Sequence, residues 1–281
     1  MNPSKKIFSY IKITRPINVL ITFIVVVVAI LISAQHQIEL TKIILVSLSA
    51  ALIAAAGNIV NDIYDIETDK VSHPNRVLAQ GLLSKKEAVF LYNFFNVIAI
   101  ILASRISDYL IVIVLFTIIL LYVYSAYLKK LPLVGNIVIA FITGLAFIYG
   151  GFAADNPNGA IVPAVFAFLI NLIREIVKDI QDIEGDSKLS FKTFPILYGI
   201  KKSKIIILFF TILLTGFTFF PFITQLYKIE YFLIVMIFVN PLLVLSLKIL
   251  FDMKKENRYK IVSNILKINM ILGLIAIWFG R

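Results

Sequence analysis

The stretch INVLITFIVVVVAILISA, residues 17–34, carries no charged side chain. About 20 consecutive apolar residues are needed to cross the hydrocarbon core of a bilayer. The stretch is too long for the apolar part of a signal peptide and lacks a small-residue cleavage site, so it predicts a first membrane-spanning helix. Comparable apolar runs follow along the whole chain. They lie at 17–34, 41–61, 87–104, 109–128, 133–152, 160–178, 205–223, 231–250 and 261–280.

The nine runs predict an all-α integral membrane protein, with residues 1–281 forming a single transmembrane domain. Composition supports this fold class, because 60% of the residues are hydrophobic and only 15% are charged, whereas a soluble globular chain has about 25% charged residues. The chain has no cysteine, which excludes disulfides, thiolate metal sites and Fe–S clusters. Hard oxygen ligands remain as the available metal chemistry.

The formal net charge of +11 could indicate a nucleic-acid partner, but the distribution of the charge argues against one. With the N-terminus inside, all but four of the 27 Lys and Arg residues fall on internal segments. The four external ones are Lys42, Arg105, Lys228 and Arg281. This asymmetry follows the positive-inside rule. It predicts a multi-pass protein of the cell membrane with a cytoplasmic N-terminus and no nucleic-acid partner.

Two acidic octapeptides, DIYDIETD (62–69) and DIQDIEGD (179–186), begin the two longest internal connections. They match at six of eight positions and start 117 residues apart. Four predicted helices separate them, so both octapeptides lie on the same side of the membrane. The spacing predicts a parallel repeat of helices one to four and five to eight, with helix nine added.

The aspartates of each octapeptide lie at positions i, i+3 and i+7, which a continuous helix places on one face. Asn61 extends the first face. Like charges on one face repel each other, and Mg²⁺ would offset them, since it takes one or two carboxylates and completes its shell with water and phosphate oxygens. Several cations that could bind phosphate lie on the same side of the membrane. They are Arg76, Lys129, Lys130, Arg174, Lys178 and Lys192.

Other metal sites fit poorly. Neither octapeptide has the spacing of a calcium-binding EF-hand loop, and the two histidines, His36 and His73, fall on opposite sides of the membrane. Structural interpretations remain open for individual side chains. Lys129 and Lys130 could serve to set the membrane topology rather than to bind phosphate. Tyr124 could be an interfacial aromatic residue, and three asparagines could form interhelical hydrogen bonds. These are Asn18, Asn58 and Asn171.

The stretches NDIYDIETD (61–69) and DIQDIEGD resemble the two metal motifs of the UbiA family of intramembrane prenyltransferases. TRPIN (14–18), HPNRVLAQG (73–81) and YSAYLKKLPLVGN (124–136) are also similar to that family. The resemblance implies a helix bundle around a central cavity, Mg²⁺ as cofactor, and a prenyl diphosphate and a lipid acceptor as substrates. It implies Asp65 and Asp182 as catalytic residues. The implied metal or diphosphate contacts are Asn61, Asp62, Asp65, Asp69, Asp179, Asp182 and Asp186.

Within the family, residues 131–151 and 171–186 are most similar to the members that make archaeal ether lipids. Those enzymes transfer a geranylgeranyl group to geranylgeranylglyceryl phosphate and form the second ether bond. An enzyme for an aromatic acceptor, such as 4-hydroxybenzoate or a naphthoate, would carry the same acidic motifs. The residues expected to contact substrate are Arg15, Asn18, Asn58, Arg76, Tyr124, Lys129, Asn171, Arg174, Lys178 and Lys192.

Two other functional classes are compatible with a repeated membrane bundle. A cation-coupled transporter also contains repeats and acidic residues, but it would place carboxylates near the bilayer midplane and interrupt its helices there. In this sequence the acidic residues lie at predicted helix ends. A non-catalytic scaffold would leave the duplicated octapeptide without a role.

Overall fold

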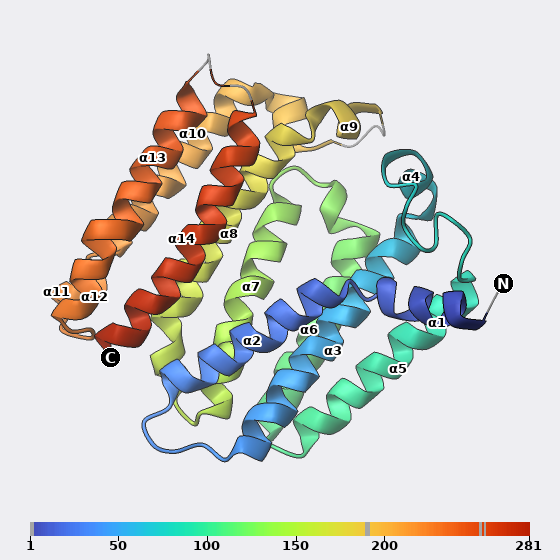
Figure 1. The fold of residues 1–281 in the computed structure, drawn as a ribbon, viewed down its shortest axis with the longest axis horizontal. Coiled ribbons are helices and arrows are strands. Elements are labelled where there is room, and N and C mark those ends of the chain that lie inside the picture. Colours follow the sequence, from blue (N-terminus) through green and yellow to red (C-terminus); the bar gives the residue numbers. More distant parts are fainter. Residues whose placement is uncertain (1–2, 189–191, 253–254, 256) are drawn as a thin grey trace. The chain divides into compact units, whose positions relative to one another are not determined.

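Every regular element in the described part of the chain is a helix (Figure 1). The computed structural model describes residues 3–188, 192–252, 255 and 257–281. The elements are α1 (Pro3–Lys12), α2 (Pro16–Ser33), α3 (Leu40–Tyr64), α4 (Ile66–Ser72), α5 (Lys85–Ser104), α6 (Asp108–Ala126), η1 (Leu128–Lys130), α7 (Val134–Ala153), η2 (Pro157–Ala160), α8 (Ile161–Gln181), α9 (Ile183–Lys188), α10 (Phe194–Phe217), α11 (Phe220–Ile223), α12 (Ile229–Ile234), the π-helical turn η3 (Val235–Val239), α13 (Asn240–Phe251) and α14 (Arg258–Gly280).

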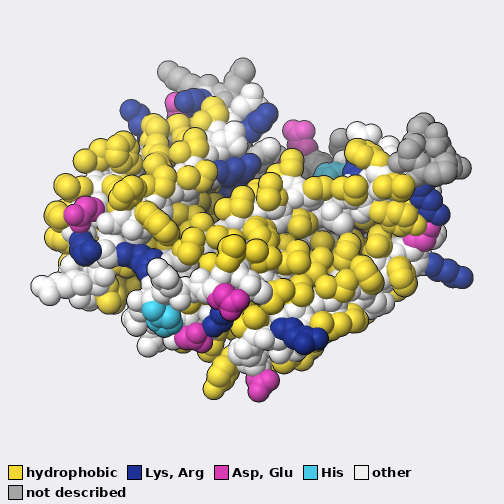
Figure 2. Space-filling view, turned by 60° about the horizontal axis from the view of Figure 1, so that its bottom comes forward, with side chains coloured by type: hydrophobic (Ala, Val, Ile, Leu, Met, Phe, Trp, Pro, Cys, Tyr) yellow, Lys and Arg dark blue, Asp and Glu magenta, His cyan; other side chains and the backbone are white. Residues whose placement is uncertain are grey.

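Nine helical segments within the described residues are long and apolar enough to cross a membrane, which confirms the expected number. Many of their large apolar side chains face outward, such as Phe209, Ile212 and Phe279, each at least 60% exposed. Figure 2 shows a broad area of hydrophobic side chains with charged side chains mostly at its margins. An apolar exterior of this extent suits lipid rather than water. The chain is a multi-pass membrane protein.

The seventh span begins earlier than the sequence indicated. Helix α10 starts at Phe194, whereas the apolar run was expected from residue 205. The two parts of α10 meet at Gly199, whose φ of 85° and ψ of 157° are not helical. Glycine adopts a positive φ readily because it has no Cβ. The polar segment before 205 is thus helical on both sides of a glycine kink.

The chain divides into two compact units, the first of which contains residues 1–129 and 146–160. Helix α3 is the centre of this unit and packs against α2, α5 and α6. Its small residues allow close packing, and a polar contact reinforces it. The Ser49 hydroxyl donates a hydrogen bond to the Ala99 carbonyl at 2.9 Å and accepts one from Tyr149 Oη at 3.1 Å.

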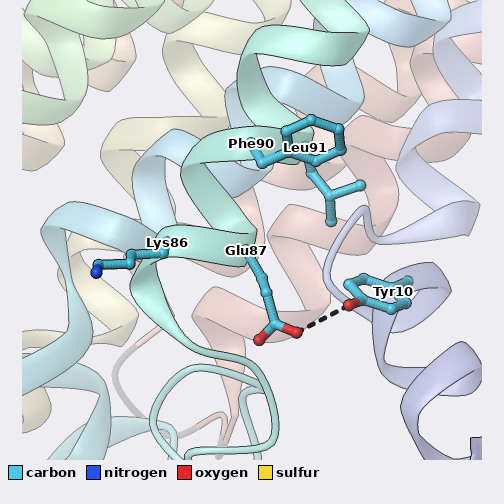
Figure 3. A pocket seen from close by; sticks show the side chains of 5 residues that line it. All are labelled: Tyr10, Lys86, Glu87, Phe90 and Leu91. Carbon is cyan, nitrogen blue, oxygen red and sulfur yellow. Dashed lines mark hydrogen bonds between the residues drawn. The ribbon is translucent and has the colours of Figure 1, made fainter.

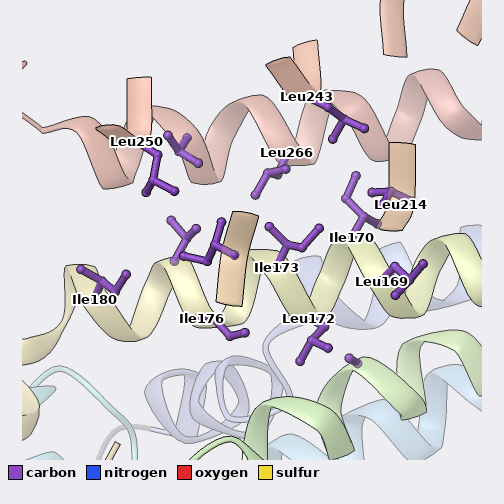
Figure 4. Close-up of a cluster of buried hydrophobic side chains, with 14 of the residues drawn as sticks. Leu169, Ile170, Leu172, Ile173, Ile176, Ile180, Leu214, Leu243, Leu250 and Leu266 are labelled. Carbon is purple, nitrogen blue, oxygen red and sulfur yellow. The ribbon is translucent and has the colours of Figure 1, made fainter. Parts of the chain in front are cut away.

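The second unit contains residues 130–145 and 161–281. Helix α8 is its centre and packs against α10 and α14. Buried side chains of α8, including Ile173 and Ile176, form one apolar cluster with Leu214, Leu243 and Leu266 (Figure 4). This packing fixes the last turns of α8, where the second octapeptide begins.

Replacement of Gly144 by alanine is expected to lower the free energy of unfolding by about 1–3 kcal/mol, the usual penalty for overpacking. An added Cβ on Gly144 of α7 would lie 2.8 Å from the Ala164 carbonyl oxygen of α8. Gly273→Ala in α14 is the matched control, because nothing lies within 4 Å of its added Cβ. SDS-induced unfolding followed by circular dichroism measures both variants. Equal stability would contradict this packing.

Candidate active site

The first octapeptide contains a break between two helices. Helix α3 ends at Tyr64 and α4 begins at Ile66, and Asp65 between them has φ −101° and ψ 7°. Helical hydrogen bonds continue on both sides, from Asp65 N–H to the Asn61 carbonyl at 3.0 Å and from Asp69 N–H to the Asp65 carbonyl at 2.7 Å. The octapeptide is therefore divided between α3 and α4, with Asp65 as the residue between them.

Each aspartate of this motif is paired with a different cation. The Arg15 guanidinium binds Asp62, and Arg76 Nη1 donates to both carboxylate oxygens of Asp69 at 2.7 Å. Lys129 Nζ lies 2.5 Å from Asp65 Oδ1. These three ion pairs, which we call the first acidic cluster, bring together residues that are far apart in the sequence.

Burial makes the pairing necessary. Asp62 and Asp69 are only 3% and 4% exposed, and a carboxylate that loses its water requires a compensating charge or hydrogen bonds. Arg76 Nη1 also lies 3.5 Å from Asp62 Oδ1, so one guanidinium serves two carboxylates. The cluster thus alternates carboxylates and cations around two buried carboxylates, where electrostatic interactions are stronger than in bulk water.

The three cations come from three loops or helix ends of the first unit. Arg15 precedes Pro16 of α2, Arg76 lies in the loop after α4, and Lys129 lies in η1 after α6. Arg15 has a φ of 55°, in the left-handed region that non-glycine residues adopt at an energetic cost. The fold accepts this strain at the residue that pairs with Asp62. Lys129 Nζ also approaches Asn61 Oδ1 at 3.4 Å.

The second octapeptide shows the same local break. Helix α8 ends at Gln181 and α9 begins at Ile183, so Asp182 occupies the position that corresponds to Asp65. The Asp186 N–H bonds to the Asp182 carbonyl at 2.9 Å. Asp179 accepts a hydrogen bond from Asn136 Nδ2 at 2.9 Å. The side chain of Asp182 is exposed and that of Asp186 is half-buried.

Arg174 lies in α8 shortly before this motif. Its Nη1 contacts Glu175 Oε1 at 2.8 Å and Asn171 Oδ1 at 3.4 Å. Its Nε is buried and has no hydrogen-bond partner among the residues that the structure describes. A buried guanidinium N–H without an acceptor is a vacant donor for an anionic ligand.

Two of the expected substrate contacts form hydrogen bonds within the protein, Asn58 to the turn between α1 and α2 and Asn171 to α7. Asn58 Nδ2 donates to the Thr14 carbonyl at 2.8 Å, and Asn171 Nδ2 donates to Thr143 Oγ1 at 2.9 Å. For Asn171 this is the interhelical alternative left open by the sequence, whereas the bond of Asn58 is to a turn. The remaining expected contacts are exposed or half-buried: Asn18, Lys178 and Lys192 are exposed, and Tyr124 is half-buried.

Asn136 is a candidate site residue that the sequence did not single out. It is 9% exposed at the start of α7 and holds Asp179. The only signal in the sequence was its place at the end of YSAYLKKLPLVGN. That signal gives no indication that its partner would be Asp179, 43 positions later.

The donor types fit magnesium. Among the described residues, no three His, Asp or Glu side chains converge on one point to enclose an ion by themselves. Such an arrangement would suit zinc or calcium better than Mg²⁺, which uses one or two carboxylates and takes its other ligands from water and phosphate. Carboxylate and amide oxygens are the protein ligands that Mg²⁺ uses, and each octapeptide carries such groups.

A separate surface pocket of about 470 Å³ lies between α1 and α5 (Figure 3). Tyr10, Lys86, Glu87, Phe90 and Leu91 line it, and Tyr10 Oη donates to Glu87 Oε1 at 2.9 Å. The adjacent Lys6 ammonium lies 2.7 Å from the same carboxylate oxygen, and this hydrogen bond raises the pKa of Lys6. No residue of either octapeptide lines the pocket, so it is separate from the acidic motifs.

The fold is that of a polytopic membrane protein. Carboxylates and cations lie together at the ends of its helices, which suits the binding of a strongly charged group beside lipid. Residues 21–271 match the UbiA prenyltransferase family, and the chain belongs to this family. It is therefore a membrane-embedded prenyltransferase.

Two relatives, from Methanosphaera stadtmanae and Saccharolobus solfataricus, are digeranylgeranylglyceryl phosphate synthases. The first is 34% identical over 281 residues, which is 100% of this chain and 99% of the relative. The second is 35% identical over 278 residues, covering 97% and 96% of the two chains.

Solved structures share the fold. A structure described as giving insight into digeranylgeranylglyceryl phosphate synthase has 32% identity and a TM-score of 0.83, and it covers 98% of both chains. A UbiA homologue from Archaeoglobus fulgidus, bound to GPP and Mg²⁺, has 20% identity and a TM-score of 0.74, covering 96% of this chain and 99% of its own. The UbiA-type helical fold expected from the motifs is confirmed.

Proposed function

We propose that this enzyme transfers a geranylgeranyl group from its diphosphate to the free hydroxyl of geranylgeranylglyceryl phosphate and thereby forms the second ether of an archaeal lipid. The observation that carries this proposal is the first acidic cluster, in which Asp62, Asp65 and Asp69 alternate with three cations. The names of the two relatives at 34% and 35% identity support the choice of acceptor.

The cluster has both components that a metal diphosphate requires. Carboxylate oxygens of Asp62, Asp65 and Asp69, with the Asn61 amide oxygen, would hold Mg²⁺, and we assign Asp179, Asp182 and Asp186 of the second motif to the same task. Bound Mg²⁺ would neutralise the negative charge that develops on the diphosphate as it leaves. Arg15, Arg76 and Lys129 would turn from their carboxylates to phosphate oxygens.

Loss of the diphosphate leaves an allylic carbocation at C1 of the prenyl group. The chain's own contribution is to keep water away from this cation and to present the acceptor hydroxyl to it. Asp62 and Asp69 are already shielded from water by the fold, which supports this role. The bond that breaks is the C1–O bond to diphosphate, the bond that forms is the C1–O ether, and the hydroxyl proton passes to a basic group or to solvent.

The phosphate of the acceptor would be bound in the second unit. Arg174 supplies the vacant buried Nε donor, and we assign Asn171, Lys178 and Lys192 to the same region of the substrate. An acceptor without a phosphate, such as 4-hydroxybenzoate, would leave less charge for these residues to bind. This favours the phosphorylated lipid over an aromatic acceptor.

We place the reaction at the cytoplasmic face of the cell membrane, on the basis of the positive-inside distribution of Lys and Arg. Both octapeptides belong to the segments that this rule assigns to the inside. The isoprenoid chains of both substrates would lie among the membrane-spanning helices.

A product assay tests the acceptor. Purified enzyme with geranylgeranyl diphosphate, geranylgeranylglyceryl phosphate and Mg²⁺ is expected to give digeranylgeranylglyceryl phosphate, identified by mass spectrometry. EDTA should abolish the product and excess Mg²⁺ should restore it. Product from 4-hydroxybenzoate alone would overturn the acceptor assignment. Substrate counterflow in liposomes without any prenyl transfer would instead favour a transporter.

A further inference from the structure

Lys204 is a buried lysine in a part of the fold that the proposed reaction does not use. It lies in α10, shortly after the kink at Gly199, and is 8% exposed. Its ammonium faces two aromatic rings, at 5.4 Å from the centroid of Phe251 and 5.9 Å from that of Tyr259. Phe251 is the last residue of α13, and Tyr259 lies in the first turn of α14.

A second cation contacts the same tyrosine. The Arg258 guanidinium carbon lies 5.0 Å from the Tyr259 ring centroid. Arg258 also donates from Nη1 to the Asp252 carbonyl at 3.2 Å and from Nη2 to Tyr259 Oη at 3.3 Å. Two cations thus contact one ring near the point where α13 ends and α14 begins; Figure 1 shows where these two helices meet.

The ammonium of Lys204 lacks an anionic partner in the described part of the chain, where the two ring contacts are its only interactions. Contact with aromatic faces offsets only part of the loss of water around a buried ammonium. The first acidic cluster provides a contrast, because there each buried carboxylate has a cation. Lys204 is thus a buried cation that faces no carboxylate within the described residues, and an anionic ligand would offset its charge.

We propose that Lys204, Arg258 and Tyr259 bind the phosphate group of an anionic membrane lipid. The surroundings favour a lipid over a soluble anion. Phe251 is 46% exposed and Ile205 of α10 is 56% exposed, so apolar surface for the lipid chains adjoins the cations. Lipid phosphates lie at the ends of membrane-spanning helices, where basic residues attract anionic headgroups. The Tyr259 hydroxyl adds a polar group beside the phosphate.

The proposed lipid site shares no residue with the proposed catalytic site. It contains no residue of either octapeptide and none of the residues assigned to the diphosphate or the acceptor. Loss of the lipid site can therefore be separated from loss of prenyl transfer.

Lipid-dependent thermal unfolding of the purified full-length chain tests the proposal. Phosphatidylglycerol, phosphatidylcholine and sodium phosphate are each titrated into the protein in a neutral detergent. Phosphatidylglycerol is expected to raise the unfolding temperature of the wild type at lower concentration than phosphatidylcholine. Lys204→Met should weaken the apparent affinity for phosphatidylglycerol about tenfold or more, the effect of losing one charge-assisted contact.

Lys201→Met is the matched control, since Lys201 is exposed in the same helix; this variant should respond to phosphatidylglycerol like the wild type. Without added lipid, Lys204→Met should be at least as stable as the wild type, because methionine removes a buried charge and keeps the apolar stem. Arg258→Gln provides a second variant with the same expected loss of affinity.

The three probes separate the possible results. A rise in unfolding temperature that saturates with phosphatidylglycerol, and that is weakened in Lys204→Met and Arg258→Gln, supports a lipid phosphate site. Equal stabilisation by sodium phosphate, lost in the same variants, would support the phosphate site and identify the free anion as its ligand. A response to phosphatidylglycerol that is unchanged in both Lys204→Met and Arg258→Gln would overturn the proposal. The proposal would also be overturned if both variants were less stable than the wild type by the same amount with and without lipid, and phosphatidylglycerol still stabilised them as it stabilises the wild type.

Discussion

Asp65→Asn and Asp182→Asn are each expected to reduce prenyl transfer by about 100-fold or more, the scale seen when one group that stabilises developing charge is removed. Each aspartate occupies the break between two helices, at corresponding positions of the two octapeptides. An amide keeps the size of the side chain but loses the negative charge that would bind Mg²⁺. The assay measures radiolabelled geranylgeranyl transfer with saturating substrates.

Glutamates in the same two octapeptides provide matched controls. Glu67 and Glu184 are exposed, and Glu67 pairs with Lys70 at 2.8 Å on the surface of α4. Glu67→Gln and Glu184→Gln also remove one negative charge from each motif, yet activity should stay within about twofold of the wild type, because exposed pairs of this kind contribute little. Turnover like that of the wild type in both asparagine variants would contradict the metal assignment.

The membrane fold could be predicted from the sequence because bilayer thickness fixes the length of an apolar helix. Nine apolar runs therefore predicted nine spans. The error in a predicted boundary was largest at α10, because the charged residues Lys201 and Lys202 interrupt the apolar pattern although the helix already begins at Phe194. The break at Asp65 could not be predicted in the same way. Helical hydrogen bonds persist across it, so the periodicity of the motif looks continuous.

The residue types of the candidate site could also be predicted, but their pairing could not. Arg76 and Lys129 were expected to bind phosphate because of their charge and side of the membrane. Which aspartate each one contacts depends on how the loop after α4 and the turn after α6 pack against α3. The same limit applies to Asn136, whose role appears only where α7 meets α8.

Arg76→Met is expected to lower the free energy of unfolding by about 3–5 kcal/mol, the usual result of removing one partner of a buried ion pair. Asp69 is 4% exposed and Arg76 donates to both of its carboxylate oxygens. Without the guanidinium, the buried Asp69 carboxylate would lose both of its charge-assisted hydrogen bonds. Asp62 is affected less, because Arg15 still binds it. SDS-induced unfolding in detergent micelles measures the change.

The double variant Arg76→Met/Asp69→Asn separates the role of Arg76 in stability from its role in catalysis. Because asparagine carries no charge, the double variant should regain most of the lost stability, whereas prenyl transfer should remain lost, since a metal ligand and a phosphate contact are both missing. Lys70→Met, at an exposed ion pair in the neighbouring helix, should change stability by no more than about 0.5 kcal/mol. If Arg76→Met were as stable as Lys70→Met, the buried Asp69 carboxylate would need another partner. The ion pairs of the first acidic cluster would then not be what stabilises the buried carboxylates.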